Sequence, residues 1–103
     1  MFNIQPVTLS RRAAEEVHKI MLTKNIPPEY GLRVGIRGGK GCGGAQLIIG
    51  FDKKRNSDLS YDMEGISVYI DKKHTLYVVG KEVDFYEGDD AKGFVFVDKP
   101  MAG

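Results

Sequence analysis

The chemistry that this sequence could support is concentrated in one segment, Arg37-Gly38-Gly39-Lys40-Gly41-Cys42-Gly43-Gly44, which contains five glycines and the only cysteine. Glycine tolerates positive φ and lets the backbone approach another group closely. A thiol with so few neighbouring side chains is poorly shielded, which suits a metal ligand or a nucleophile. The same pattern is also typical of a tight turn whose cysteine packs as a small hydrophobic residue. The residues themselves leave both interpretations open.

A catalytic cysteine requires a base close in space. The only histidines are His18 and His74, and nothing in the sequence places either of them beside Cys42. The glycine run lacks the G-x-x-x-x-G-K-S/T pattern of a phosphate-binding loop. We therefore do not expect Cys42 to be a catalytic nucleophile. A histidine within hydrogen-bond reach of Cys42 would revive the alternative of a thiol-dependent enzyme.

One cysteine is too few for a closed zinc or iron–sulfur site, which usually takes several protein ligands. A two-fold dimer could bring two copies of Cys42 together, because each contact is repeated across the axis. Two further ligands would still have to come from elsewhere. Reasoning from the residues alone therefore ends at an exposed thiol in a glycine-rich turn.

The segments on either side of the glycines have the alternation of half-buried strands. Leu32, Val34 and Ile36 share one face of the segment before the glycines, and residues 45–51 repeat the pattern after them. The sequence therefore predicts a hairpin with Cys42 near its tip.

The other elements have shorter or weaker patterns. Residues 10–24 carry apolar side chains at three- and four-residue steps, which predicts an amphipathic helix that Ser10 or Thr8 caps. Glu64-Gly65 is expected to join two strands of a second hairpin. Further short strands are expected, the last of them buried on both faces; they fall within residues 2–9, 83–85 and 94–97. Residues 71–80 have strand propensity without alternation and stay ambiguous.

Composition predicts one domain over residues 1–103, large enough for a single core. The hydrophobic fraction of 42% and charged fraction of 28% are ordinary, and the net charge of +1 gives no reason to expect nucleic acid or membrane as a partner. A lone cysteine cannot form an internal disulfide, which fits a reducing compartment. We expect a cytoplasmic protein.

The order of these pieces resembles the HesB-like family, also called the A-type iron–sulfur carriers, over nearly the whole chain. Gly31-Leu32-Arg33-Val34-Gly35-Ile36 is similar to the strand before the family's first cysteine, and Gly41-Cys42-Gly43-Gly44 matches its G-C-S-G segment, with Gly43 in place of serine. The similar pieces elsewhere lie at 7–14, 65–66, 83–85, 93–96 and Pro100.

This resemblance implies a mainly β fold, a HesB-like pseudo-barrel or sandwich of short mixed strands with an N-terminal amphipathic helix. It also implies a short helix or turn over residues 71–80. Members accept iron or an iron–sulfur cluster, hold it between subunits and pass it to apo client or assembly proteins. Cys42 would then be the metal ligand, in a homodimer or higher homo-oligomer. The binding loop would contain Gly39, Gly41, Gly43 and Gly44.

The family also uses a C-terminal Cys-x-Cys pair, and these 103 residues contain no counterpart to it. We therefore expect a divergent member in which only Cys42 carries over, and in which exogenous ligands such as glutathione, water or another protein complete the site. The alternative is a HesB-fold protein-binding module that has lost metal binding.

Overall fold

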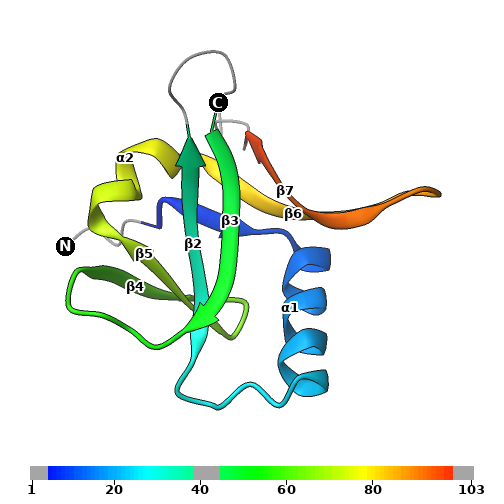
Figure 1. Cartoon of the computed structure of the whole chain (residues 1–103), viewed down its shortest axis with the longest axis horizontal. Coiled ribbons are helices and arrows are strands. Elements are labelled where there is room, and N and C mark those ends of the chain that lie inside the picture. The colour runs from blue at the N-terminus through cyan, green and yellow to red at the C-terminus, as the bar shows by residue number, and fades with distance from the viewer. Residues whose placement is uncertain (1–4, 39–44, 99–103) are drawn as a thin grey trace.

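The computed structural model describes residues 5–38 and 45–98, which form two sheets and one long helix (Figure 1). The first sheet has three strands in the order β1-β6-β7. Its strands are β1 (Val7–Leu9), β6 (Lys81–Glu87) and β7 (Lys92–Asp98). β1 is parallel to β6, whereas β6 and β7 form an antiparallel hairpin that projects from the body of the fold.

The second sheet has four strands in the order β3-β2-β5-β4. Its strands are β2 (Gly31–Gly38), β3 (Ala45–Asp52), β4 (Asp58–Met63) and β5 (Ile66–Asp71). β2 is antiparallel to β3 and parallel to β5. The β4–β5 turn has positive φ at Glu64 and Gly65, as the predicted second hairpin requires. The prediction of a mainly β fold of mixed strands is confirmed.

The helix α1 (Arg11–Thr23) begins where predicted, because the Ser10 hydroxyl accepts a hydrogen bond from the Ala13 backbone N–H. The same hydroxyl donates to Asp84 Oδ1 at 2.6 Å, and Arg12 donates to both Asp84 oxygens. The bonds from Arg12 and then Ser10 hold the pKa of Asp84 well below its usual range. These contacts fasten the start of the helix to β6.

The core lies between the two sheets and α1. Its buried apolar side chains come from every layer: Val7, Leu9, Ala13, Ala14, Val17, Leu32, Val34, Ile66, Val68, Ile70, Val78, Val83 and Phe85. The Tyr61 hydroxyl connects the sheets, since it accepts from the Val7 N–H and donates to the Val7 carbonyl. Burial raises the pKa of Tyr61 to about 12.

Residues 71–80, ambiguous by propensity, contain the 3₁₀ turn η2 (Lys72–His74) and the short helix α2 (Thr75–Val78). This confirms the helix or turn implied by the family resemblance. The Asp71 side chain caps the turn by accepting from the Lys73 N–H, and Gly80 with φ of 83° turns the chain toward β6.

The prediction that the last strand is buried on both faces was wrong. In β7, Phe94 and Phe96 face the core, whereas Val95 and Val97 are exposed on the other side. An entirely apolar run carries no alternation from which to tell a half-exposed strand from a buried one.

Arg33 of β2 and Asp58 at the start of β4 form the most enclosed ion pair of the described residues. The Asp58 side chain is fully buried, and both its oxygens accept from the Arg33 guanidinium at 2.7 Å. Arg33 also donates to Asp52 and to the Lys53 carbonyl, and Asp58 accepts from the Arg55 N–H. The hydrogen bonds from Arg33 lower the pKa of Asp58.

We expect Gly31→Ala to destabilise the protein by about 1–3 kcal/mol through overpacking. A Cβ at Gly31 would stand 2.6 Å from the Ser67 carbonyl oxygen and 2.7 Å from the Tyr69 ring. Gly50→Ala is the matched control, because nothing lies within 4 Å of a Cβ at that position. Urea unfolding of the two variants measures the difference. Equal stabilities would contradict the tight packing at Gly31.

We expect Asp58→Asn to lower the free energy of unfolding by about 3 kcal/mol at neutral pH, since it leaves a half-buried guanidinium short of its counter-charge. A lowered pKa means that the ionised carboxylate stabilises the fold above its unfolded pKa of about 4, and that this contribution is lost as the pH falls through the folded pKa. The difference from wild type should therefore shrink below pH 4.

The control for this experiment is Asp62→Asn, at an exposed position of β4. It should change stability by less than about 0.5 kcal/mol. Urea unfolding between pH 3 and pH 7 provides both curves. A difference between Asp58→Asn and wild type that stays constant over this range would refute the role of the Asp58 charge.

Candidate functional site

The β2–β3 hairpin carries the segment that contains Cys42. All eight residues of β2 are paired with β3, from Gly31 opposite Asp52 to Gly38 opposite Ala45. Residues 39–44 therefore connect two strand ends that are held side by side. The hairpin predicted from alternation is confirmed. The predicted site residues lie outside the described part of the chain: Gly39, Gly41, Cys42, Gly43 and Gly44.

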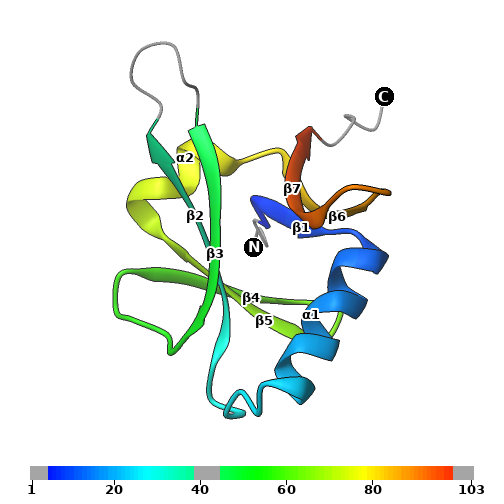
Figure 2. The same ribbon diagram turned by 45° about the vertical axis from the view of Figure 1, so that its right-hand side comes forward.

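The hairpin is held from both sides. On its inner face Leu32 and Val34 are fully buried in the core. On its outer face the His74 ring packs on Gly35, where Nδ1 would be 2.9 Å from a Cβ. β2 is also the second strand of the sheet, with β5 on its other side. The strand that leads to the glycine segment is therefore a fixed part of the fold, and Figure 2 shows its end beside α2.

A groove of about 380 Å³ runs over the outer face of this hairpin, between the strands and η2. Apolar side chains line much of it: Val34, Ile36, Ile48, Ile49 and Phe51. The rest of the lining comes from Gly35 and Gly50 and from the polar residues Arg33, Asp52, Arg55, Asp71, Lys73 and His74. Most of these charges already have partners: Asp52 accepts from Arg33 and Arg55, and Asp71 from the Lys73 N–H. The bond from the Lys53 N–H and the charge of Arg55 help to lower the pKa of Asp52.

Within residues 5–38 and 45–98, no three His, Cys, Asp or Glu side chains gather closely enough to hold a metal ion. His18 is placed on α1, with Nε2 3.0 Å from the Glu64 carbonyl oxygen at the β4–β5 turn. His74 packs on Gly35. Neither histidine therefore belongs to a metal-ligand cluster among the described residues. Cys42, the ligand predicted from the sequence, lies outside them, and the described part of the chain supplies the paired strands on either side of residues 39–44.

Sequence reasoning missed the Arg33–Asp58 pair, which supports the end of the hairpin where β2 begins and β3 ends. Arg33 was visible as a polar residue on the outer face of its strand, but Asp58 lies in a charged connection among other ionic residues. Nothing in its local sequence distinguishes a buried carboxylate from a solvated one. Its partner lies 25 positions away in the chain.

No helix of the described residues is long and apolar enough to cross a lipid bilayer. No family model matches the chain.

Individual proteins are similar to the chain over most of its length. The chain is 39% identical over 98 residues to the iron-sulfur cluster insertion protein ErpA of Actinobacillus succinogenes. The aligned region covers 94% of this chain and 84% of that protein. The ErpA of Aliivibrio fischeri is 36% identical over 98 residues, with the same coverage.

Solved structures share the fold. Escherichia coli SufA, described as involved in the biosynthesis of iron-sulfur clusters, superposes with a TM-score of 0.73 at 24% identity, over 94% of this chain and 83% of SufA. IscA, solved with a 2Fe-2S cluster, gives a TM-score of 0.75 at 19% identity over 89% and 84% of the two chains. The fold is thus HesB-like, as predicted. More than a third of the aligned residues are identical to those of ErpA proteins. This identity, together with the shared fold, places the chain in the A-type iron–sulfur carrier family.

Proposed function

We propose that this protein is an iron–sulfur cluster carrier that binds iron or a cluster through Cys42 and delivers it to apo proteins in the cytoplasm. The observation that supports this most is the combination of family membership with the position of the chain's only cysteine. Cys42 lies in the six-residue connection between Gly38 and Ala45, which are paired strand ends. A fixed hairpin would present the thiolate at one end of the molecule.

In this proposal the chain supplies only some of the ligands that the iron or cluster needs. One cysteine per chain supplies one thiolate, so two copies of the chain would supply two of the four ligands that a cluster usually takes. Glutathione or another small thiol would supply the others. Gly39, Gly41, Gly43 and Gly44 would leave the thiolate accessible and would offer backbone N–H groups to sulfide. The divergence from the family that we propose is that the site uses no Cys-x-Cys pair from these 103 residues.

Delivery in this proposal is ligand exchange and not enzymatic catalysis. A cysteine thiolate of the apo acceptor binds an iron of the cargo as the Cys42 thiolate leaves it, and the exchange is repeated until the acceptor holds every iron. No electron is transferred, and each incoming thiol releases a proton that a departing thiolate takes up. The cargo moves toward the acceptor because a site with more cysteines binds it more tightly.

We expect anaerobic reconstitution with ferrous iron, sulfide and glutathione to give coloured wild-type protein, whereas Cys42→Ser stays colourless and folded. Visible absorbance, bound iron and far-ultraviolet circular dichroism measure this. Omission of glutathione should lower the bound iron severalfold, because thiolates are the preferred ligands of the cluster.

A matched control moves the only thiol elsewhere. Cys42→Ser/Ser57→Cys places one cysteine on the exposed connection between β3 and β4, and it should also stay colourless. Colour in that variant would mean that any surface thiol collects iron sulfide, and colour in Cys42→Ser would rule out Cys42 as the ligand. Colourless wild type in every condition would favour the alternative, a protein-binding module that has lost its metal.

A further inference from the structure

The segment formed by η2 and α2 exposes three large apolar side chains. Leu76 is 85% exposed, Tyr77 is 66% exposed and Val79 is 54% exposed. A single exposed apolar residue is ordinary in a folded protein, but three of them within four positions form a continuous apolar surface. Such a surface is typical of a site that binds a partner.

The local geometry turns these side chains outward together with two lysines. His74 and Val78 are four positions apart and face inward, since the His74 ring packs on Gly35 and Val78 is fully buried. The residues on the other side of the segment are exposed. We define the α2 patch by these exposed residues, which are Lys72, Lys73, Leu76, Tyr77 and Val79.

The α2 patch is positively charged, although the net charge of the whole chain is only +1. Residues 72–81 contain three lysines and no acidic residue. The nearest acid in the sequence, Asp71, already accepts a hydrogen bond from the Lys73 backbone N–H. The apolar side chains of the patch are therefore flanked by cations alone.

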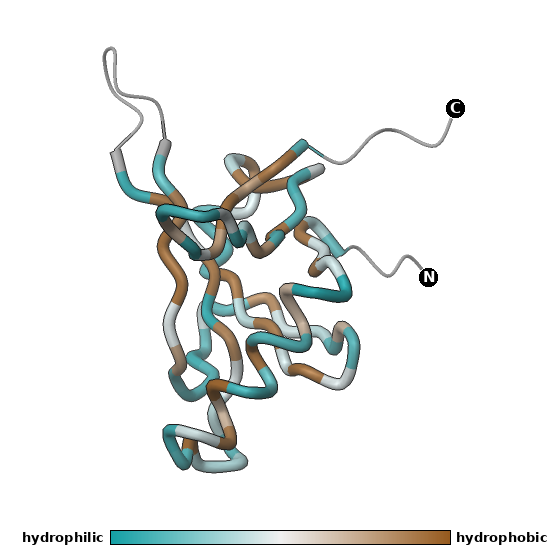
Figure 3. Tube along the Cα trace, turned by 90° about the vertical axis from the view of Figure 1, so that its right-hand side faces the viewer, coloured by the Kyte–Doolittle hydropathy of each residue, from teal (hydrophilic) through white to brown (hydrophobic). Residues whose placement is uncertain are grey.

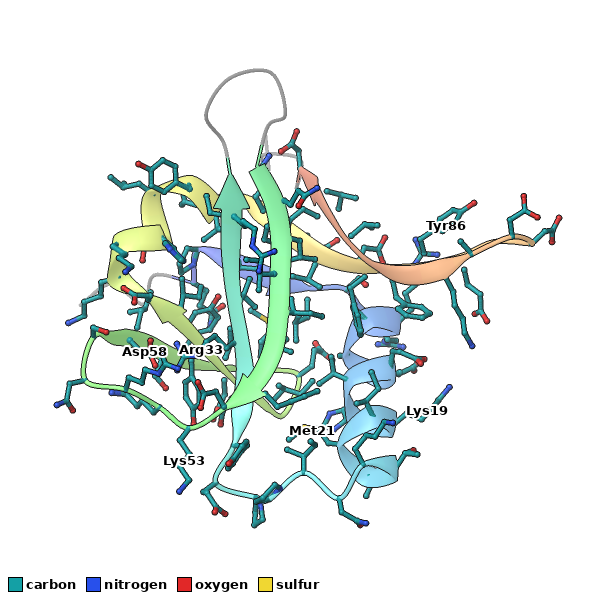
Figure 4. The ribbon with its side chains drawn as sticks, viewed as in Figure 1. Lys19, Met21, Arg33, Lys53, Asp58 and Tyr86 are labelled. Atoms are coloured by element: carbon teal, nitrogen blue, oxygen red, sulfur yellow. The ribbon has the colours of Figure 1, made fainter. Side chains whose placement is uncertain are left out.

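The connection between β3 and β4 enlarges this positive region. The Lys72 backbone N–H donates to the Ser57 carbonyl at 2.9 Å, which holds η2 against the connection. Lys53, Lys54 and Arg55 of this connection are exposed. Both segments lie on the left of Figure 1, and Figure 4 labels Lys53. The net charge of the chain thus conceals a local excess of cations on one side of the molecule.

The β6–β7 hairpin also exposes apolar side chains, but its turn has the opposite charge. Its apolar run is the brown stretch before the C-terminal grey trace in Figure 3, and Tyr86 (Figure 4) is 57% exposed. Glu87, Asp89 and Asp90 are exposed at the turn. Figures 1 and 2 show this turn on the opposite side of the molecule from α2. An anionic surface would attract the α2 side and repel the turn, so that the molecule would bind in one orientation.

The composition of the α2 patch matches an anionic lipid surface. Leucine and valine gain by burial at the boundary between headgroups and acyl chains, and tyrosine is favoured at the level of the headgroups. Lysine side chains keep their ammonium groups in water beside the lipid phosphates while their apolar stems cover the surface. A protein partner fits less well, because lysine is depleted from protein–protein interfaces.

We propose that the α2 patch binds the anionic surface of a lipid bilayer. Leu76, Tyr77 and Val79 enter the headgroup boundary, and Lys72 and Lys73 lie beside the lipid phosphates. The attachment is reversible, because three side chains bury little apolar area and each lysine adds only a modest attraction. The contact involves neither the cysteine nor a bound cluster, and it therefore goes beyond the proposed carrier function.

The test is cosedimentation of the apo protein with vesicles of phosphatidylcholine and phosphatidylglycerol in a two-to-one ratio. The wild type should bind them at least tenfold more tightly than vesicles of phosphatidylcholine alone, and added sodium chloride should weaken the binding. Lys72→Gln and Lys73→Gln should each weaken it about fivefold. Leu76→Ser/Tyr77→Ser should weaken it at least tenfold, because it removes most of the apolar area that is buried.

Matched controls make the same changes at positions of similar exposure elsewhere. Leu22 on α1 is 81% exposed, and Leu22→Ser/Tyr86→Ser should leave vesicle binding unchanged. Lys92→Gln removes one exposed lysine from β7 and should also have no effect. Thermal unfolding shows whether every variant is folded. Equal binding by Leu76→Ser/Tyr77→Ser and the wild type would refute the proposal, and so would a wild type that does not bind the anionic vesicles.

A fluorescent residue tests insertion directly, because the chain contains no tryptophan. Tyr77→Trp should give an emission that shifts to shorter wavelength on the anionic vesicles and is quenched by brominated phosphatidylcholine, whereas Tyr86→Trp should show neither effect. An unquenched tryptophan at position 77 on bound protein would mean that charge alone holds the protein, and would overturn the insertion of the patch. All these measurements use apo protein, so none of the outcomes depends on whether the carrier function is correct.

Discussion

The buried carboxylate of Asp58 constrains much of this structure. A fully buried negative charge has to be compensated, and one arginine from the strand at the centre of the larger sheet compensates it with two short hydrogen bonds. The same guanidinium holds Asp52 and the Lys53 carbonyl, so the end of β3 and the start of β4 are fixed to β2 at one place. The direction of the hairpin that carries the glycine segment depends on this arrangement.

The charge pair and the glycine segment in which we propose the metal ligand are joined to opposite ends of the same paired strands. Arg33 lies near the beginning of β2, whereas the glycine segment follows its last residue, Gly38. The ionic contacts can therefore hold the hairpin without contributing ligands or charge to its tip. This division would suit the carrier function that we propose, in which the fold has to persist while cargo is bound and released.

Local patterns predicted the elements that depend on neighbours in the chain. Ser10 before a 3.6-residue periodicity indicated the start of α1, alternation indicated the β2–β3 hairpin, and Glu64-Gly65 indicated the turn between β4 and β5. The parallel pairings of β1 with β6 and of β2 with β5 had no such signal, because they join residues that are far apart in sequence. The four apolar residues 94–97 also gave no information on which face is covered.

For the candidate site, the sequence singled out the cysteine and its glycines as candidates, and the family resemblance supplied the function that we propose for them. What it could not identify was their support, because the partners of Arg33 and the ring above Gly35 come from distant segments. Helical and strand propensities report on one stretch at a time, and a contact between two stretches has no signature in either.

The packing of His74 on Gly35 has a consequence for the evolution of these proteins. The imidazole occupies the volume where a side chain at position 35 would stand, so that a larger residue there requires a smaller or displaced one at position 74. The two positions are separated by 38 residues of intervening chain, yet they should vary together among relatives. Such covariation would trace the attachment of η2 to the hairpin in relatives that have no structure.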